Sequence, residues 1–396
     1  MTPSDPEDNE SSAPTPTLLD VVRQWGRIGC LGFGGPPTHI ALLRDLCVER
    51  KRWLAPSDFE DAIAACNLLP GPASTQLAIF CAWRVRGRPG AIAGGLAFIV
   101  PGLVAILGLA ALFLAGSPPL WVKGASAGAG AAVAAVAVHA GRGLLSGSRR
   151  RPQNASVARR ITYLAFGGVA AATVGAWLVL ILLGSGVAEL IAQRPTKPGA
   201  TTPAIAPFPL LATSVASGGV LASLLWVAFK VGALSYGGGF VIVPLMQSDA
   251  VSHYHWMTNP QFLNAVALGQ ITPGPVVLTV AVVGYAAAGV GGALLAVAVA
   301  FAPSFAFVLF GARHFDRIRS DVRARSFLDG AGPAAIGAIF GSAIPLAVAI
   351  AEPWQYAVLA GAAVLLILLR RGVVLTLLLA GSVGVVVALA GAQLPH

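Results

Sequence analysis

The sequence predicts an all-helical (all-α) integral membrane protein of two related halves in opposite orientation, with helices that break inside the membrane. Three observations predict this fold class: the composition, an internal repeat, and the distribution of basic residues over the loops. Of the 396 residues, 56% are hydrophobic and only 11% are charged. Soluble domains carry about a quarter charged residues. The charged side chains are therefore too few to cover the surface of a soluble protein of this length.

Seven mostly apolar segments approach the roughly 17–25 residues that a helix needs to cross a bilayer. They are 91–115, 125–141, 161–188, 208–229, 293–312, 331–351 and 373–393, with 356–369 as a shorter candidate. Residues 1–17 are rich in Pro, Ser, Thr, Asp and Glu, which predicts a disordered tail and no signal peptide. With the helix breaks described below, we expect about ten membrane-inserted segments in a multi-pass protein of the plasma or inner membrane.

Charge and cysteine usage exclude several classes of function. The net charge of +10 comes from basic residues in short loops, as in membrane proteins with cytoplasmic loops. Nucleic acid is not an expected partner, because no basic stripe with interleaved aromatic residues is present. The four cysteines lack CxxC spacing, and His253 with His255 gives too few ligands for a metal. We expect no cofactor, no metal and no catalytic residues, and therefore not an enzyme.

An internal repeat appears when the sequence is compared with itself at the offset that places Gly29 on Gly232. Trp53 then meets Trp256, and Pro70-Gly71-Pro72 meets Pro273-Gly274-Pro275. Matches of alanine and leucine arise by chance in so apolar a chain, whereas a matched tryptophan and a matched Pro-Gly-Pro do not readily do so. The expected divisions are a first repeat at 18–192, a linker at 193–207 and a second repeat at 208–396.

The basic residues indicate that the two repeats have opposite orientations. The loop 84–89 contains three arginines, whereas its partner, 285–292, contains no Lys or Arg. The contrast reverses later, because 116–124 contains only Lys123 whereas 312–326 contains five arginines. Basic loops remain cytoplasmic, which assigns 44–53, 84–89, 142–160 and 312–326 to that side. Inverted repeats place a transport site near the midplane, where the halves meet.

The same charges predict helices that enter the membrane and return. Both flanks of the apolar stretch 58–82 are basic, so this stretch must turn back, at Pro70-Gly71-Pro72. The stretch 261–284 is expected to turn at Pro273-Gly274-Pro275. The segments 18–47 and 221–246 are expected to be broken helix pairs that turn at Gly34-Gly35-Pro36 and Gly237-Gly238-Gly239. Irregular backbone at this depth is tolerated only inside protein or beside a water-filled cavity.

Four such turns form a candidate anion site. Glycine allows a close approach of a ligand and proline favours a helix start, so helices should begin near residues 36, 72, 239 and 275. Their free N–H groups and positive dipole ends suit an anion without a buried charge. Nearby polar candidates are His39, Asn67, Ser74, Thr75, Gln76, Ser235, Gln270, Thr272 and Thr279. The alternative is that glycine and proline only permit close helix packing.

Charged residues near the turns are further candidates. Lys230 and Arg27 occupy equivalent positions and could balance part of an anion's charge, or Lys230 reaches the membrane interface instead. Glu60 and Asp61 are candidates for a coupling proton, the alternative being that they stabilise a helix start. His39 is either a donor or proton carrier, or a packed and hydrogen-bonded core residue.

At these residues the sequence resembles the chromate ion transporter family in its long, two-domain form. The matching stretches cover about residues 18–140 and 221–345. They are GFGGPPTHIALL, RKRWL, CNLLPGPASTQLAI and GRPGAIAGGLAFIVPG, followed by LSYGGGFVIVPLMQ and ALGQITPGPVVLTVAVVGY. Two positions depart from the pattern: Tyr236 opens the second glycine turn, and Asn259 stands where an acidic residue is expected.

The resemblance implies export of chromate driven by the proton motive force, with sulfate as a competing oxyanion. The expected partners are this oxyanion and the lipid bilayer, and a homodimer remains open. A channel, or a carrier for another small oxyanion such as sulfate, is the alternative function.

Overall fold

A computed structural model describes residues 16–66, 71–149, 156–173, 178–193, 219–235, 239–312 and 321–395. These residues form helices and no strand. Four helices are long and apolar enough to cross a membrane: Ala73–Phe113, Leu120–Ser146, Val276–Gly311 and Val322–Val348. Four shorter apolar helices accompany them: Leu178–Ala192, Val220–Leu234, Pro353–Leu368 and Val373–Leu389. The predicted all-helical membrane fold is confirmed.

The first repeat begins with a helix whose start is fixed locally. Thr17 Oγ1 accepts a hydrogen bond from the Asp20 amide at 3.1 Å, and the Asp20 carboxylate accepts from the Thr17 amide at 2.9 Å, which is a capping box. The elements are α1 (Leu18–Leu31), α2 (Pro36–Arg44), η1 (Asp45–Arg50), α3 (Pro56–Cys66), α4 (Ala73–Phe113), α5 (Leu120–Ala131), α6 (Val133–Arg149), α7 (Val157–Thr173) and α8 (Leu178–Ala192).

The second repeat has a similar order of elements, with two further short turns, η4 and η6. Its elements are α9 (Val220–Leu234), α10 (Ile242–Gln247), η3 (Ser248–His253), α11 (Asn259–Ile271), η4 (Val276–Leu278), α12 (Thr279–Gly311), α14 (Val322–Val348), α15 (Pro353–Ala363), η6 (Val364–Leu368) and α16 (Val373–Leu389). The π-helical turns η1 and η3 follow α2 and α10 at equivalent positions. The sequence repeat is therefore also a structural repeat.

Details of the backbone recur at matched positions. The long helices α4 and α12 each bend at a glycine with positive φ, which is 60° at Gly87 and 61° at Gly289. Arg52 and His255 also have nearly the same φ, 52° and 54°. Few non-glycine residues adopt a positive φ, so its recurrence at one offset supports a common fold for the two repeats.

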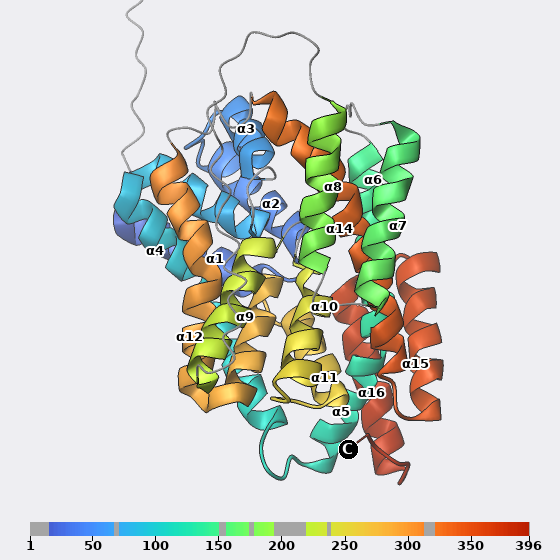
Figure 1. Cartoon of the computed structure of the whole chain (residues 1–396). Helices are drawn as coiled ribbons and strands as arrows, with labels where there is room; N and C mark the ends of the chain where they lie inside the picture. Colours follow the sequence, from blue (N-terminus) through green and yellow to red (C-terminus); the bar gives the residue numbers. More distant parts are fainter. Residues whose placement is uncertain are drawn as a thin grey trace, which may run out of the picture.

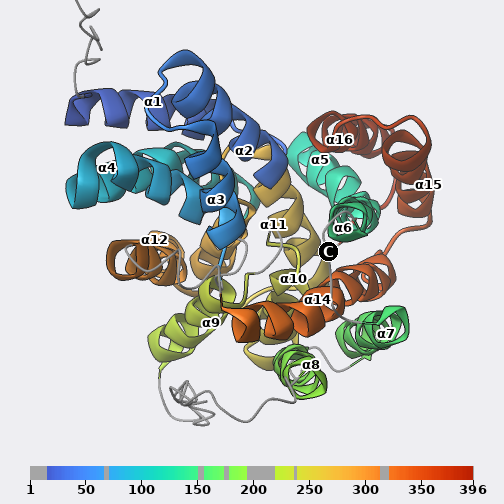
Figure 2. The same cartoon turned by 90° about the horizontal axis from the view of Figure 1, so that it is seen from above.

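The repeats are inverted and interleaved. In Figure 1, α3, α7 and α8 lie toward the upper end of the molecule, whereas α11, α15 and α16 lie in its lower half. Helices α7 and α8 of the first repeat pack against α14 of the second, and α16 packs against α5 of the first (Figure 2). The long helices α4 and α12 pack against each other, each with its own repeat's first helix, α1 or α9, alongside. Each repeat therefore completes its packing with helices of the other.

One apolar segment differs from the expectation. The stretch 161–188 is expected to be a single apolar segment, but it contains parts of two helices, because α7 ends at Thr173 and α8 begins at Leu178. A straight helix of that length would be about 42 Å long, more than the roughly 30 Å hydrocarbon core. The loop predicted at 142–160 is also shorter, since α6 extends to Arg149 and α7 begins at Val157. Residues 1–15 of the expected tail and 194–207 of the expected linker lie outside the described residues.

Candidate functional site

The first predicted turn separates α1 from α2. Helix α1 ends at Leu31 and α2 begins at Pro36, as the sequence predicts. Gly34 and Gly35 have φ values of 94° and 77°, a region that residues with a side chain rarely adopt. The Gly35 carbonyl accepts hydrogen bonds from the amides of Thr38 and His39 and so closes the first turn of α2. The chain therefore breaks here because of its local sequence.

The two Pro-Gly-Pro segments also break the chain. Helix α3 ends at Cys66 and α4 begins at Ala73, while α11 ends at Ile271 and η4 begins at Val276. The central glycines, Gly71 and Gly274, have φ values of 118° and 97°. Pro72 directly precedes α4 and Pro275 directly precedes η4. Asn67 and Pro70 lie outside the described residues.

The fourth break, between α9 and α10, is less regular. Helix α9 ends at Leu234, and α10 begins at Ile242, three residues later than predicted. Gly239 has a φ of 92° and lies in a turn, which delays the start of α10. Gly237 and Gly238 lie outside the described residues.

The second Pro-Gly-Pro segment docks onto the first repeat. The Gly32 carbonyl accepts a hydrogen bond from the Gly274 amide at 3.0 Å and is 2.9 Å from His39 Nε2. On the other side of the ring, Ser74 Oγ lies 3.2 Å from Nδ1. With Nε2–H donating to the carbonyl, Nδ1 accepts from the serine. We call Gly32, His39, Ser74 and Gly274 the histidine junction.

Both nitrogens of His39 are thus engaged by the protein. The ring is fully buried and stands edge-on to Phe98, with 5.0 Å between ring centres. The histidine junction therefore joins three breaks. His39 links Gly32, beside the first glycine turn, to Ser74, after the first Pro-Gly-Pro, and Gly32 in turn binds Gly274 of the second. This geometry fits a positioning residue.

The first Pro-Gly-Pro segment docks onto the second repeat. A Cβ atom on Gly71 would lie 3.3 Å from Ser304 Oγ on α12 and 3.4 Å from the Gly232 carbonyl on α9. Gln76 lies against the same point, with Nε2 only 2.6 Å from that Cβ position. Thr75 precedes Gln76, and Ser235 follows Gly232 by about one turn of α9. We call Gly71, Thr75, Gln76, Ser235 and Ser304 the polar junction.

Several buried polar groups at these breaks have no hydrogen-bond partner in the described structure. They are Thr75 Oγ1, Ser235 Oγ, Ser304 Oγ and Gln270 Nε2. Buried polar groups are almost always paired. Four unpaired groups close to the breaks therefore indicate that this region can bind a polar ligand. Thr272 and Thr279 differ, because their hydroxyls donate to the carbonyls of Leu268 and Val276, both at 2.8 Å.

Sequence reasoning missed Ser304. It is the polar residue within the apolar segment 293–312, directly after Pro303, and Pro303 matches Pro101 of the first repeat. A polar residue directly after a matched proline in an apolar segment is a sequence feature by which Ser304 can be recognised as a site candidate. The equivalent residue of α4 is Gly102, where an added Cβ would lie 2.2 Å from the Pro273 carbonyl. Each Pro-Gly-Pro segment therefore packs on the other repeat's long helix just after the matched proline.

The charged candidates are not placed symmetrically. Lys230 Nζ is 2.5 Å from Asp249 Oδ2, their side chains are 17% and 10% exposed, and Nζ lies 5.6 Å from the centre of the Trp226 ring. Arg27 is exposed, and no ion pair joins it to another described residue. Asp249 already balances the charge of Lys230.

The two acidic candidates, Glu60 and Asp61, lie in the first half of α3. Glu60 is exposed and pairs with Arg44, and its neighbour Asp61 is half-buried. The adjacent Asp58 pairs with Arg84 of α4. These contacts tie α2, α3 and α4 together at the edge of the first repeat.

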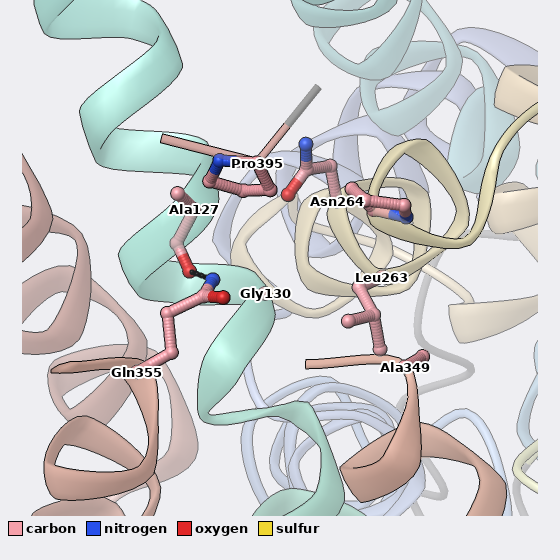
Figure 3. A pocket seen from close by; sticks show the side chains of 8 residues that line it. Ala127, Gly130, Leu263, Asn264, Ala349, Gln355 and Pro395 are labelled. Carbon is pink, nitrogen blue, oxygen red and sulfur yellow. Dashed lines mark hydrogen bonds between the residues drawn. The ribbon is translucent and has the colours of Figure 1, made fainter. Parts of the chain in front are cut away.

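Two cavities outside the two junctions offer few free polar groups to an anion. Figure 3 shows a small pocket between α5, α11 and α15, where Gln355 Nε2 already donates to the Ala127 carbonyl at 2.8 Å. A larger cavity of about 230 Å³ lies between α5, α11 and α16 and is lined mainly by apolar side chains such as Phe113, Trp121 and Leu377. Neither is lined by a glycine turn or a Pro-Gly-Pro segment.

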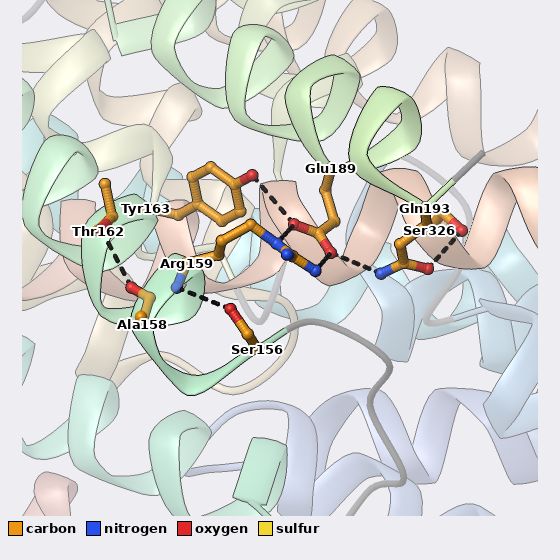
Figure 4. A network of polar contacts seen from close by, with 8 residues as sticks. All are labelled: Ser156, Ala158, Arg159, Thr162, Tyr163, Glu189, Gln193 and Ser326. Carbon is orange, nitrogen blue, oxygen red and sulfur yellow. Dashed lines mark hydrogen bonds and ion pairs between the residues drawn. The ribbon is translucent and has the colours of Figure 1, made fainter.

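A polar network fastens α7, α8 and α14 (Figure 4). The buried Glu189 accepts two hydrogen bonds from Arg159, at 2.9 and 3.0 Å, and one from Tyr163 at 3.0 Å. Gln193 donates to the same carboxylate at 2.6 Å and accepts from Ser326 at 2.8 Å. The network brings residues from the two stretches 142–160 and 312–326 together, which agrees with their assignment to one side of the membrane.

No group of three or more potential metal ligands occurs among the described residues. Cys47, Cys66 and Cys81 are buried and Cys30 is exposed, all as free thiols.

The fold and these junctions define a multi-pass membrane protein built as an inverted repeat, with broken helices that meet between the halves. Transporters of this architecture bind their substrates at that meeting point.

The chain belongs to the chromate transporter family. The family model described as chromate transporter matches residues 19–190 and 222–385, one match in each repeat. A chromate transport protein of Cupriavidus metallidurans is 34% identical over 352 residues, covering 85% of this chain and 84% of the relative. A chromate transport protein of Pseudomonas aeruginosa is 28% identical over 358 residues, covering 87% and 84%. No solved structure matches.

Proposed function

We propose that this chain exports chromate across the plasma membrane, driven by the proton motive force. The observation that carries the proposal is the family match over both repeats, together with relatives named as chromate transport proteins over 84% of their length. The fold supports it, since an inverted repeat of broken helices suits alternating access better than it suits catalysis.

The mechanism that we propose uses the four breaks as the substrate site. Helix starts near Pro36, Pro72, Gly239 and Pro275 present free N–H groups and positive dipole ends to an oxyanion. Gly34, Gly35, Gly71 and Gly274 allow its close approach. Because each Pro-Gly-Pro segment packs on the opposite repeat, rocking of one repeat against the other changes both junctions together, which alternates access to the anion.

The charged candidates take secondary roles in this mechanism. Lys230 would contribute to charge balance only when Asp249 releases it, since the two form an ion pair in the structure. The exposure of Arg27 and of Glu60 argues against direct contact of either with the anion. Proton coupling through Glu60 or Asp61 would act through the contacts of α3 with α2 and α4.

Flux measurements on the purified full-length protein in lipid vesicles test this function. We expect chromate uptake that saturates, accelerates by exchange with chromate on the other side, and follows an imposed pH gradient. Chromate, sulfate and phosphate should be compared side by side in the same vesicles. Absence of chromate flux in folded protein would refute the proposal.

A carrier or channel for another oxyanion such as sulfate is the second candidate. Hydroxyl donors without a fixed charge recognise sulfate as well as chromate, and the polar junction contains three such hydroxyls, of Thr75, Ser235 and Ser304. Flux that is faster for sulfate would favour this candidate. Flux that follows only the anion gradient, without saturation or exchange, would indicate a channel.

A further inference from the structure

Three hydroxyl groups of the polar junction lack partners in the part of the chain that the structure describes. They belong to Thr75, Ser235 and Ser304, and each of these residues is 0% exposed. Leaving a buried hydroxyl unpaired is costly, and folded proteins rarely do so. The first hydroxyl comes from one repeat and the other two from the second. Ser304 lies beside Gly71, Thr75 follows Pro72 in α4, and Ser235 lies about one turn after Gly232, whose carbonyl also faces Gly71. Unpaired hydroxyls gathered around one Pro-Gly-Pro segment point to a ligand that supplies hydrogen-bond acceptors.

We propose that the polar junction binds one tetrahedral oxyanion per chain and that Ser304, Ser235 and Thr75 donate hydrogen bonds to its oxygens. The inference rests on the proposed function, because it places the transported substrate. Hydrogen bonds to an ionised acceptor are about twice as strong as those between neutral groups. The long helix α4 starts at Ala73, beside these hydroxyls, and adds its positive dipole end.

The histidine junction does not form a second, symmetry-related site. The repeat places Gly32 at the position of Ser235, Gly102 at that of Ser304 and Leu278 at that of Thr75. None of these three has a polar side chain. The polar side chains that the histidine junction does contain, His39 and Ser74, already bond to protein atoms. The inverted repeat therefore builds two similar junctions, of which one retains donors for a ligand.

The substitution Ser304→Ala separates a ligand role from a structural one. Removing an unpaired buried hydroxyl relieves its desolvation cost, so the melting temperature of the anion-free variant should equal or exceed that of the wild type. The rise in melting temperature on adding sodium chromate or sodium sulfate should be lost, and the half-saturating chromate concentration for flux should increase about tenfold or more.

Ser342→Ala is the matched control. Ser342 is also 0% exposed, but its hydroxyl donates to the Ile339 carbonyl of its own helix at 2.7 Å. This variant should retain the anion-dependent rise in melting temperature. If Ser304→Ala does not fold, Thr75→Val keeps the side-chain shape and tests the same site with the same measurements.

The outcomes distinguish the site from the function. An undiminished anion-dependent rise and unchanged half-saturation in Ser304→Ala and Thr75→Val, with wild-type flux intact, would overturn the site and leave the proposed function standing. A wild-type protein with neither chromate flux nor any oxyanion-dependent rise would overturn both. Equilibrium binding of two anions per chain would overturn the single-site stoichiometry.

Discussion

The two junctions are built from equivalent segments, yet they satisfy their polar groups in opposite ways. In the histidine junction, one carbonyl accepts from Gly274 and from His39, and the ring takes its second bond from Ser74. In the polar junction, the equivalent of His39 is Ile242, and the hydroxyls of Ser235 and Ser304 have no partner among the described residues. An inverted repeat can therefore complete one contact with its own side chains while the equivalent contact keeps hydroxyls without partners among the described residues.

The largest expected effect is that of His39→Ala. This change removes the hydrogen bonds of His39 to the Gly32 carbonyl and the Ser74 hydroxyl, and it creates a cavity beside Phe98. We expect chromate flux to fall by two orders of magnitude or more, and a stability loss of about 2–4 kcal/mol, measured by vesicle flux and thermal unfolding. His253→Ala, at an exposed histidine, should be nearly neutral. Normal flux in His39→Ala would contradict a positioning role for this junction.

The next effect is that of Gly102→Ala in α4. Its Cβ would lie 2.2 Å from the Pro273 carbonyl, so the second Pro-Gly-Pro segment must shift. We expect roughly tenfold slower flux, since overpacking at a close contact costs about 1–3 kcal/mol. Gly108→Ala in the same helix has nothing within 4 Å and should be neutral or slightly stabilising. Equal flux in the two variants would show that the docking of this segment is dispensable.

A smaller effect is expected at Lys230 and Asp249, which lie on either side of the break before α10. Asp249→Asn leaves a partly buried lysine without its counter-ion and should destabilise the protein by about 1–3 kcal/mol, less than a fully buried pair because both side chains retain some exposure. Lys230→Met with Asp249→Leu should restore much of that stability in a double-mutant cycle. If the double variant keeps full chromate affinity, Lys230 takes no part in charge balance.

The smallest effect is expected for Glu60→Gln. The ion pair with Arg44 is exposed, so its loss should change stability by no more than about 1 kcal/mol. Unaltered dependence of flux on the pH gradient would remove Glu60 as a coupling residue. Asp45→Asn, which breaks the exposed pair with Arg50, is a matched control.

Much of the fold was predictable because its signals are local or additive. Gly34, Gly35 and the Pro-Gly-Pro segments force breaks through their own backbone preferences, and the structure places helix ends beside them. The loop arginines predicted the inverted orientation, since their effect on topology depends on their number and position along the chain.

The site was only partly predictable. His39, Ser74, Thr75, Gln76, Ser235 and Gln270 were recognised by their distance along the chain from a turn, but the sequence could not distinguish paired from unpaired side chains. Ser304 was missed because it lies near Gly71 only through the packing of α12 against the first repeat. Asp249 was missed for the same reason, since its contact with Lys230 joins two segments across a break.

The membrane class, the repeat, the inversion and the approximate positions of the breaks are all encoded in local features of the amino-acid sequence. Each of these follows from composition or from the conformational preferences of a few consecutive residues. Which junction is complete within the protein, and which one keeps hydroxyls without partners among the described residues, depends on the tertiary packing. Whether a buried hydroxyl is paired depends on groups some 200 residues away in the chain, and their distance is set by helix packing between the two repeats.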